Sequence, residues 1–199
     1  MSGPAPRAGG RGYALVGVLL ALLLFGTAAA LWFGGRAGEA IGGNFTLQNP
    51  AGQTITARSF RGKYMLVYFG YTHCPDVCPT TLSAVSAALR RMGPKAAQVV
   101  PVFITVDPAR DTPEVMGHYV ALFSHRIVGL SGSAAEIAKV AGEYHVYYAK
   151  HVTGPGPDDY SMDHSSVLYL MGPNGRFIAP LPADDAAPKL AAALERLIG

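Results

Sequence analysis

The cysteines carry the clearest chemistry in this sequence. Only two occur, Cys74 and Cys78, and both lie in the segment Tyr71–Pro79 (YTHCPDVCP). If a helix begins near Pro75, a residue type that suits the first helical position, Cys74 lies at the helix N-terminus and Cys78 one turn later on the same face. A helix N-terminus stabilises negative charge and therefore favours the thiolate, the form that attacks disulfides and binds metals. The pair could close a disulfide or share one metal ion.

A purely structural disulfide is the simplest alternative for this pair. Such a bridge would close a loop of only a few residues, so it would restrict the unfolded chain little. Two thiolates alone also make a poor four-coordinate zinc site. Thiolates together with an imidazole suit copper, so the positions of the histidines become important.

One histidine stands in an unusual place. His164 follows the polar loop Thr153–Asp159 and comes directly before a predicted buried strand. His73 precedes Cys74, but neighbouring side chains at a strand end point apart, so we expect it at most to support the site from nearby. The remaining histidines are expected to be ordinary, partly exposed residues; they are His118, His125, His145 and His151.

Two apolar segments predict the elements that position the cysteines. Lys63–Tyr71 (KYMLVYFGY) and Val99–Val106 (VVPVFITV) leave no side for a solvated face, which is typical of strands buried on both faces. Between them, apolar residues from Leu82 to Met92 recur at helical spacing. A strand, a helix and a second strand predict a βαβ unit with parallel strands. The cysteines follow the carboxyl end of the first strand, where open α/β sheets bind ligands.

The remaining pattern predicts an α/β domain with a mixed central sheet flanked by helices. We expect a short hairpin over 45–56, and helices over 112–123, 133–144 and 186–198, with Ser133 as the cap of the second of these. Further strands are expected over 127–130, 146–150, 166–171 and 176–178. The turn Gly172–Gly175 joins the last two strands as an antiparallel pair.

The N-terminal part predicts a membrane anchor. Tyr13–Phe33 carries no charged residue and is long enough to cross a bilayer as one helix. Arg7 and Arg11 precede it, so the positive-inside rule leaves residues 1–12 as a cytoplasmic tail and puts the rest on the far side. A cleaved signal peptide is the alternative, because small residues occur at 27–30. Our interpretation is a single-pass protein of a bacterial inner membrane.

The part beyond the anchor is expected to be a periplasmic domain on a tether. The Gly-rich segment 34–43 predicts a flexible linker, and the domain then spans residues 44–199. The whole chain has a formal net charge of only +3 and 15% charged residues. Without clustered Lys and Arg, a nucleic-acid-binding function is excluded.

Three motifs resemble those of the Sco/SenC family of copper-handling proteins. They are Tyr68–Pro79 (YFGYTHCPDVCP), Thr105–Pro113 (TVDPARDTP) and Tyr160–Ser165 (YSMDHS). The resemblance extends from about residue 42 to the C-terminus, and the anchor and tether match it too. It implies a thioredoxin-like fold with a hairpin inserted before the histidine, and copper held by Cys74, Cys78 and His164. It also implies copper supply to subunit II of cytochrome c oxidase.

The charged residues in the same motifs are expected to support the site by fixing loops, capping the helix or orienting the histidine. Arg110 lies between Asp107 and Asp111, and a loop-fixing ion pair is the plainest role for it, with docking near the copper site as the alternative. Asp76 could cap the helix or tune the thiolates. Asp163 could orient His164 through its second ring nitrogen, as metal-bound histidines usually require.

Two hypotheses on function follow, with a third that fits poorly. The first is a metallochaperone, not an enzyme, that carries Cu(I), Cu(II) or both to subunit II of cytochrome c oxidase or another copper acceptor. The second is a thiol–disulfide oxidoreductase in which Cys74 attacks and Cys78 resolves, served by a thiol reductant partner. A thiol peroxidase is suggested only by Thr72 before Cys74, and it gives Cys78 and His164 no role.

Overall fold

The computed structural model of the protein describes residues 20, 22–27 and 41–199. Ala40–Gly199 forms one unit with its own core. Within the described ranges, no helix combines the length and the apolar character that a membrane crossing needs. Most of the predicted anchor at 13–33, the tail at 1–12 and the greater part of the tether at 34–43 lie outside the described residues.

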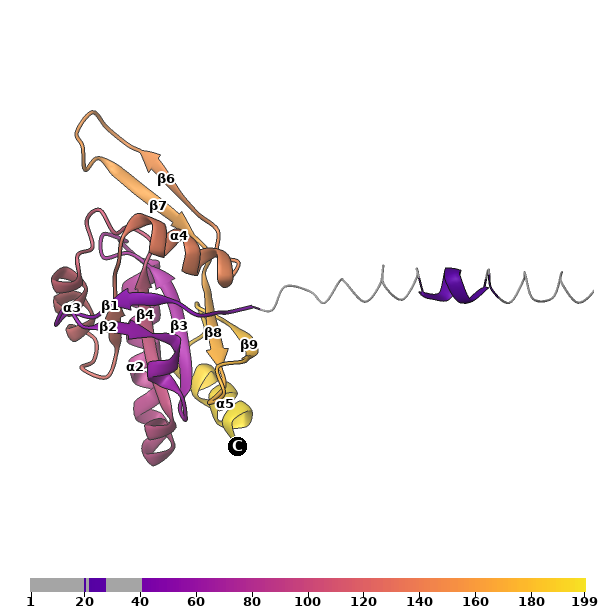
Figure 1. Ribbon diagram of the computed structural model, residues 1–199. Coiled ribbons are helices and arrows are strands. Elements are labelled where there is room, and N and C mark those ends of the chain that lie inside the picture. Colours follow the sequence, from indigo (N-terminus) through magenta and orange to yellow (C-terminus); the bar gives the residue numbers. More distant parts are fainter. Residues whose placement is uncertain (1–19, 21, 28–40) are drawn as a thin grey trace, which may run out of the picture. The chain divides into compact units, whose positions relative to one another are not determined.

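A five-stranded mixed sheet forms the centre of the domain (Figure 1). Its order is β5-β4-β3-β8-β9, in which β3, β4 and β5 are parallel and β8 and β9 run antiparallel to their neighbours. The strands span Tyr64–Gly70 (β3), Val99–Thr105 (β4), Val128–Leu130 (β5), Val167–Met171 (β8) and Phe177–Pro182 (β9). The α/β prediction with an antiparallel last pair is confirmed.

The two central strands are apolar because both faces of the sheet are covered. Every residue of β3 after Tyr64 is buried, and β4 is buried except at Val100. The helices are α2 (Val77–Arg91), α3 (Pro113–Ala121), α4 (Ala134–Glu143) and α5 (Ala187–Ile198), with short 3₁₀ helices at Ala57–Phe60 and Gly93–Gln98. Among them, α2 packs against α5, and α3 packs against β5.

The helix starts agree with the sequence except at the cysteines. Ser133 caps α4 and forms a capping box with Glu136, as predicted. Helix α2 begins at Val77, not near Pro75, so Cys74 lies in the turn before the helix. The expectation that both cysteines share one helix face is therefore wrong. Asp76 occupies the cap position, but its side chain makes no capping hydrogen bond.

Two hairpins lie outside the central sheet. One joins β1 (Thr46–Gln48) to β2 (Thr54–Thr56), as predicted. The other joins β6 (Tyr148–Val152) to β7 (Tyr160–His164) and pairs Tyr148 with His164. Periodicity predicts only the first strand of this hairpin, at 146–150, and a loop up to His164, so the structure corrects it by adding β7. The family resemblance implies a hairpin at this place. Figure 1 shows β6 and β7 extending beyond the five-stranded sheet.

Candidate metal centre

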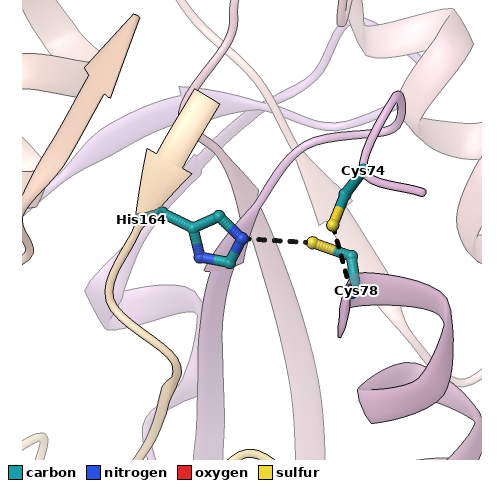
Figure 2. Close-up of side chains that lie close together, drawn as sticks. All are labelled: Cys74, Cys78 and His164. Carbon is teal, nitrogen blue, oxygen red and sulfur yellow. Dashed lines mark hydrogen bonds between the residues drawn. The ribbon is translucent and has the colours of Figure 1, made fainter. Parts of the chain in front are cut away.

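Three side chains from separate elements meet at one edge of the sheet. Cys74 comes from the turn after β3, Cys78 from the first turn of α2 and His164 from the end of β7 (Figure 2). Their two Sγ atoms and one imidazole nitrogen all lie within 4.8 Å of one another. The Cys78 Sγ and the His164 Nε2 are 3.4 Å apart. The structure thus brings together all three residues that the resemblance implied as ligands.

The spacing of these atoms suits a single small metal ion. Thiolate and imidazole ligands lie about 2.0–2.3 Å from a first-row metal, so ligands in a trigonal arrangement are about 4 Å apart. Small adjustments would bring all three atoms onto one ion. Cys74 and His164 are half-buried whereas Cys78 is buried, so the centre has a protected side and an accessible side. Soft sulfur with nitrogen is a ligand set that copper accepts in both of its common oxidation states.

The two cysteines have opposite acid–base behaviour. Both are free thiols. Hydrogen bonding from Cys78 to the Cys74 sulfur, aided by the backbone N–H groups of Cys78 and Asp76, lowers the pKa of Cys74 to about 3. The same hydrogen bond, together with burial, raises the pKa of Cys78. The backbone N–H of Cys78 lies 3.4 Å from the Cys74 Sγ. At neutral pH the metal-free pair therefore holds one thiolate and one thiol.

His164 is oriented by a carbonyl and by two aromatic rings. Its Nδ1 lies 3.2 Å from the Ser165 carbonyl oxygen. Because a carbonyl only accepts, this contact favours a proton on Nδ1 and leaves the Nε2 lone pair facing Cys78. The rings of Tyr68 and Tyr71 meet the imidazole edge-on, with centroids 5.9 and 6.0 Å away. The prediction that Asp163 orients His164 is wrong, because Asp163 pairs with His151 at 2.8 Å on the exposed side of the hairpin.

A buried tyrosine that the sequence analysis did not single out also contacts the site. Tyr68 is 1% exposed, and its hydroxyl lies 3.9 Å from the Cys78 Sγ, at the long end of hydrogen bonding to sulfur. Burial, followed by the nearby Cys78, raises the pKa of Tyr68 well above its ordinary value, so the phenol keeps its proton. The signal was available, because Tyr68 places a hydroxyl in the middle of an otherwise apolar strand.

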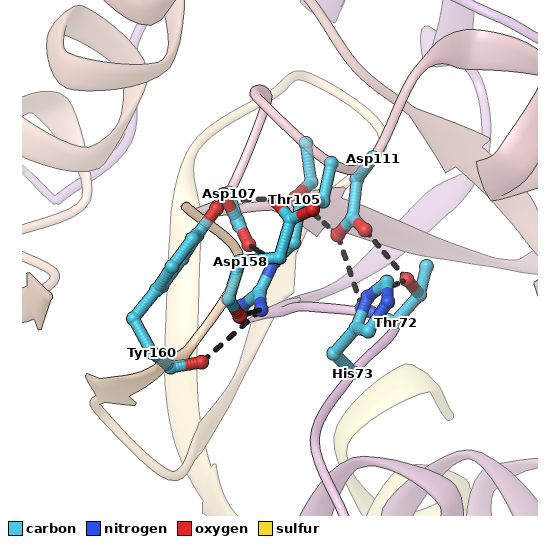
Figure 3. Close-up of polar contacts among 8 residues, drawn as sticks. Thr72, His73, Thr105, Asp107, Asp111, Asp158 and Tyr160 are labelled. Atoms are coloured by element: carbon cyan, nitrogen blue, oxygen red, sulfur yellow. Dashed lines mark hydrogen bonds and ion pairs between the residues drawn. The ribbon is translucent and has the colours of Figure 1, made fainter. Parts of the chain in front are cut away.

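The turn that carries Cys74 is fixed by a buried carboxylate. Asp111 accepts hydrogen bonds from the Thr72 backbone N–H at 3.0 Å, the Thr72 hydroxyl at 2.6 Å and the Thr105 hydroxyl at 2.7 Å (Figure 3). The predicted loop-fixing ion pair of Arg110 is confirmed, and its partner is Asp107 at 2.6 Å. Asp111 instead ties the end of β4 to the cysteine turn.

The other histidines lie apart from the cluster. His73 is exposed, and its Nδ1 lies 3.1 Å from the Thr72 hydroxyl oxygen. His118 is exposed, and its Nε2 lies 3.8 Å from the Glu114 Oε1. All four histidines predicted to be ordinary are exposed.

Comparisons with known proteins give a consistent result. A sequence model of the SCO1/SenC family matches residues 34–199. The sco1 protein of Schizosaccharomyces pombe is 42% identical over 157 residues, which is 77% of this chain and 59% of that protein. The mitochondrial SCO1 homologue of Homo sapiens is 40% identical over 144 residues, covering 69% of this chain and 46% of that protein. The chain thus spans about half the length of these two relatives.

Solved structures show the same similarity. The copper-bound ScoI of Bradyrhizobium japonicum is 48% identical, with a TM-score of 0.72 over 80% of this chain and 100% of that chain. The copper-bound Sco1 of yeast is 32% identical, with a TM-score of 0.73 over 79% of this chain and 87% of that chain. These neighbours confirm the thioredoxin-like α/β fold.

Proposed function

Since the chain belongs to the SCO1/SenC family, we propose that it is a copper metallochaperone that loads copper at Cys74, Cys78 and His164. The observation that carries this proposal is the convergence of two sulfurs and one imidazole nitrogen within 4.8 Å, at the rim of the sheet. The copper-bound relatives from Bradyrhizobium japonicum and yeast support the choice of metal.

A low-coordinate site with one accessible side suits a protein that gives its metal away. A closed tetrahedral centre holds its ion, whereas a three-ligand centre leaves room for an incoming ligand. Cys74 and His164 are half-buried, so an acceptor's thiolates and imidazoles can approach from that side and exchange ligands one at a time. We propose subunit II of cytochrome c oxidase as the acceptor, with another copper protein as the alternative. The family resemblance supports this choice.

The cellular setting is part of the same proposal. We propose that Tyr13–Phe33 anchors the chain in a bacterial inner membrane and that the domain lies in the periplasm. The uncharged run and the preceding Arg7 and Arg11 support this orientation. A tethered domain would meet membrane-bound acceptors at a raised effective concentration.

A thiol–disulfide oxidoreductase remains a second candidate because of the unequal thiols. The lowered pKa of Cys74 suits it for attack on an acceptor's disulfide, which would form a mixed disulfide and release one acceptor thiolate. Cys78 would then lose its proton and attack the Cys74 sulfur, freeing the second acceptor thiolate. The acceptor gains two electrons and becomes a dithiol, while this chain becomes a disulfide.

A transfer experiment tests the first function against the second. The copper-loaded full chain in detergent micelles is mixed with the metal-free, reduced copper domain of an oxidase subunit II, and copper in each protein is measured after separation. Movement of copper to the acceptor supports the chaperone, and retention of all copper on the chain contradicts it. In a parallel assay with oxidised acceptor, His164→Ala should leave disulfide reduction unchanged, because the imidazole takes no part in that exchange.

A further inference from the structure

The histidine of the candidate copper site sits on a different part of the fold from the two cysteines. His164 ends β7, and β6 with β7 forms a two-stranded sheet of its own. Cys74 and Cys78 belong to the β3–α2 junction of the central sheet. A gap of a few ångströms between these two parts would separate the ligands, so the hairpin must be held in place.

One arginine connects the two parts. Arg110 lies in the turn after β4, and its Nε donates to Asp107 Oδ2 at 2.6 Å. Its Nη1 donates to the carbonyl oxygens of Asp158 and Tyr160, both at 3.1 Å, at the start of β7. The guanidinium carbon also lies 3.6 Å from the centre of the Tyr160 ring. A single guanidinium thus binds the central turn with one edge and the hairpin with another.

Tyr160 completes the connection from the hairpin side. Its hydroxyl donates to Asp107 Oδ1 at 2.8 Å, so the two oxygens of one carboxylate bind the guanidinium and the phenol (Figure 3). Asp107 is 3% exposed and Tyr160 is 9% exposed. The Asp107 backbone N–H donates to the Thr105 hydroxyl at 2.8 Å, which ties this carboxylate to the end of β4. Hydrogen bonds to a charged group are stronger when they are buried than when they are exposed to solvent.

The same guanidinium also reaches toward the imidazole. Its carbon lies 5.9 Å from the centre of the Tyr71 ring, and that ring meets His164 edge-on at 6.0 Å. Tyr160 and His164 are the two ends of one strand. Both residues are paired with β6 in one continuous ladder, Tyr160 with Val152 and His164 with Tyr148, so a displacement at Tyr160 is passed along the paired strands to His164.

We propose that Asp107, Arg110 and Tyr160 form a clamp that docks the β6–β7 hairpin and so sets the distance between His164 and the two cysteines. This proposal rests on the proposed copper function. The three are positioning residues for the site: they act on copper through the placement of His164. Opening the clamp frees the imidazole while Cys74 and Cys78 stay in place.

Hydrogen–deuterium exchange of the metal-free, reduced full chain in detergent micelles tests the clamp directly. Tyr160→Phe keeps the ring over Arg110 and removes only the hydroxyl that donates to Asp107. Backbone amides of β6 and β7 should then exchange about tenfold faster, since a hydrogen bond to a buried charge is lost. Amides of β3 and β4 should not change. Unchanged exchange in the hairpin of both Tyr160→Phe and Arg110→Lys overturns the clamp.

A matched control uses the same substitution at the other end of the sheet. The Tyr64 hydroxyl donates to the Ile198 carbonyl at 3.2 Å, and Tyr64 begins β3, whereas the copper site lies beyond its last residue. Tyr64→Phe therefore removes one tyrosine hydrogen bond from the molecule but leaves every hydrogen bond of the clamp intact. It should leave exchange in β6 and β7 unchanged, and an equal acceleration there would show a global effect and overturn the proposal.

Copper competition separates positioning of His164 from a general loss of structure. Tyr160→Phe, introduced into the unmutated chain, should lower the copper affinity measured against a chelator about tenfold, because the same hydrogen bond is lost. In a chain that already carries His164→Ala, adding Tyr160→Phe should not lower the copper affinity further, because the clamp then has no ligand to position. A fall that persists in His164→Ala overturns the positioning role. If the unmutated chain binds no copper, the proposed function fails, while exchange still decides the clamp.

Discussion

Two thiols four residues apart have been given different chemistry by their surroundings. Cys74 lies in a turn and is half-buried, where it accepts from Cys78 and from backbone N–H groups. Cys78 is 0% exposed and faces the phenol of Tyr68. The more accessible of the two sulfurs is thus the one that carries the negative charge and meets an incoming metal or disulfide first.

The alkylation rate of Cys74 should therefore hardly depend on pH. Its pKa of about 3 is below the usual value for a thiol, so the thiolate is fully formed throughout the physiological range and is lost only as the pH falls toward the lowered pKa. Iodoacetamide labelling of the metal-free, reduced chain, read by peptide mass spectrometry, should give a flat rate from about pH 5 to about pH 8, with Cys78 unlabelled. A rate that rises about tenfold per pH unit, as an ordinary thiol gives, would contradict the account.

At the level of elements, the site depends on how closely β3 approaches α2. Gly70 ends β3, and a Cβ built there would lie 2.6 Å from the Cys78 Sγ and 2.8 Å from Cε2 of Phe103. Both neighbours are fully buried, so neither has room to move aside. The glycine is thus required by the close contact between the strand end and the buried cysteine.

Gly70→Ala should weaken both the fold and the copper site. Overpacking a core costs about 1–3 kcal/mol, and the displaced sulfur is one of the proposed ligands. Urea unfolding and copper competition measure the two effects. Gly142→Ala is the matched control, since nothing lies within 4 Å of a Cβ at this position in α4 and alanine favours a helix. Equal stability and affinity in the two variants would show that the contact does not matter.

The elements also show what the sequence could and could not predict. Strands β3 and β4 were predictable because burial on both faces leaves an unbroken apolar run. Strand β7 has no such run: it alternates the buried Tyr160 and Met162 with more exposed residues over only five positions, a pattern too short to stand out beside the preceding loop of Gly, Pro and Asp. The start of α2 was placed two residues early, since Pro75 suits a helix start but the chain turns once more before Val77.

The sequence predicts the three ligands of the candidate site but not the residues that hold those ligands in position. Cys74 and Cys78 stand out by residue type, and His164 by its position before a buried strand and by the family motif. The partners of His164 depend on tertiary packing: Asp163 is adjacent in the chain but points to His151, while Tyr68 and Tyr71 come from a distant strand. The clamp through Arg110 likewise joins residues about fifty positions apart, which local patterns do not reveal.

At the scale of the whole molecule, the proposal joins an anchor, a tether and a copper domain. The domain from Ala40 onward is a unit with its own core. The anchor is inferred from the uncharged segment Tyr13–Phe33. A retained anchor keeps the copper site at the membrane surface, whereas a cleaved signal peptide would release the domain.

Membrane fractionation of expressing bacteria decides between these two outcomes. The full chain should stay in the membrane pellet after alkaline carbonate extraction, and mass spectrometry should find Arg7 and Arg11 in the mature protein. Leu23→Arg should reduce membrane retention, because a charge at the bilayer centre costs about 3 kcal/mol, while Leu23→Ile should not. A soluble chain that begins after the small residues at 27–30 would contradict the anchor.

The central claim is that Cys74, Cys78 and His164 hold one copper ion together, and anaerobic copper titration of the reduced full chain against a competing chelator tests it most directly. We expect one copper per chain, with affinity reduced at least about 100-fold in each of Cys74→Ser, Cys78→Ser and His164→Ala, since loss of a ligand costs more than loss of an outer-shell partner. His151→Ala is the matched control, an exposed histidine on the same hairpin that pairs with Asp163. It should bind like the parent. Unchanged affinity in His164→Ala, or an equal loss in His151→Ala, would contradict the three-ligand site.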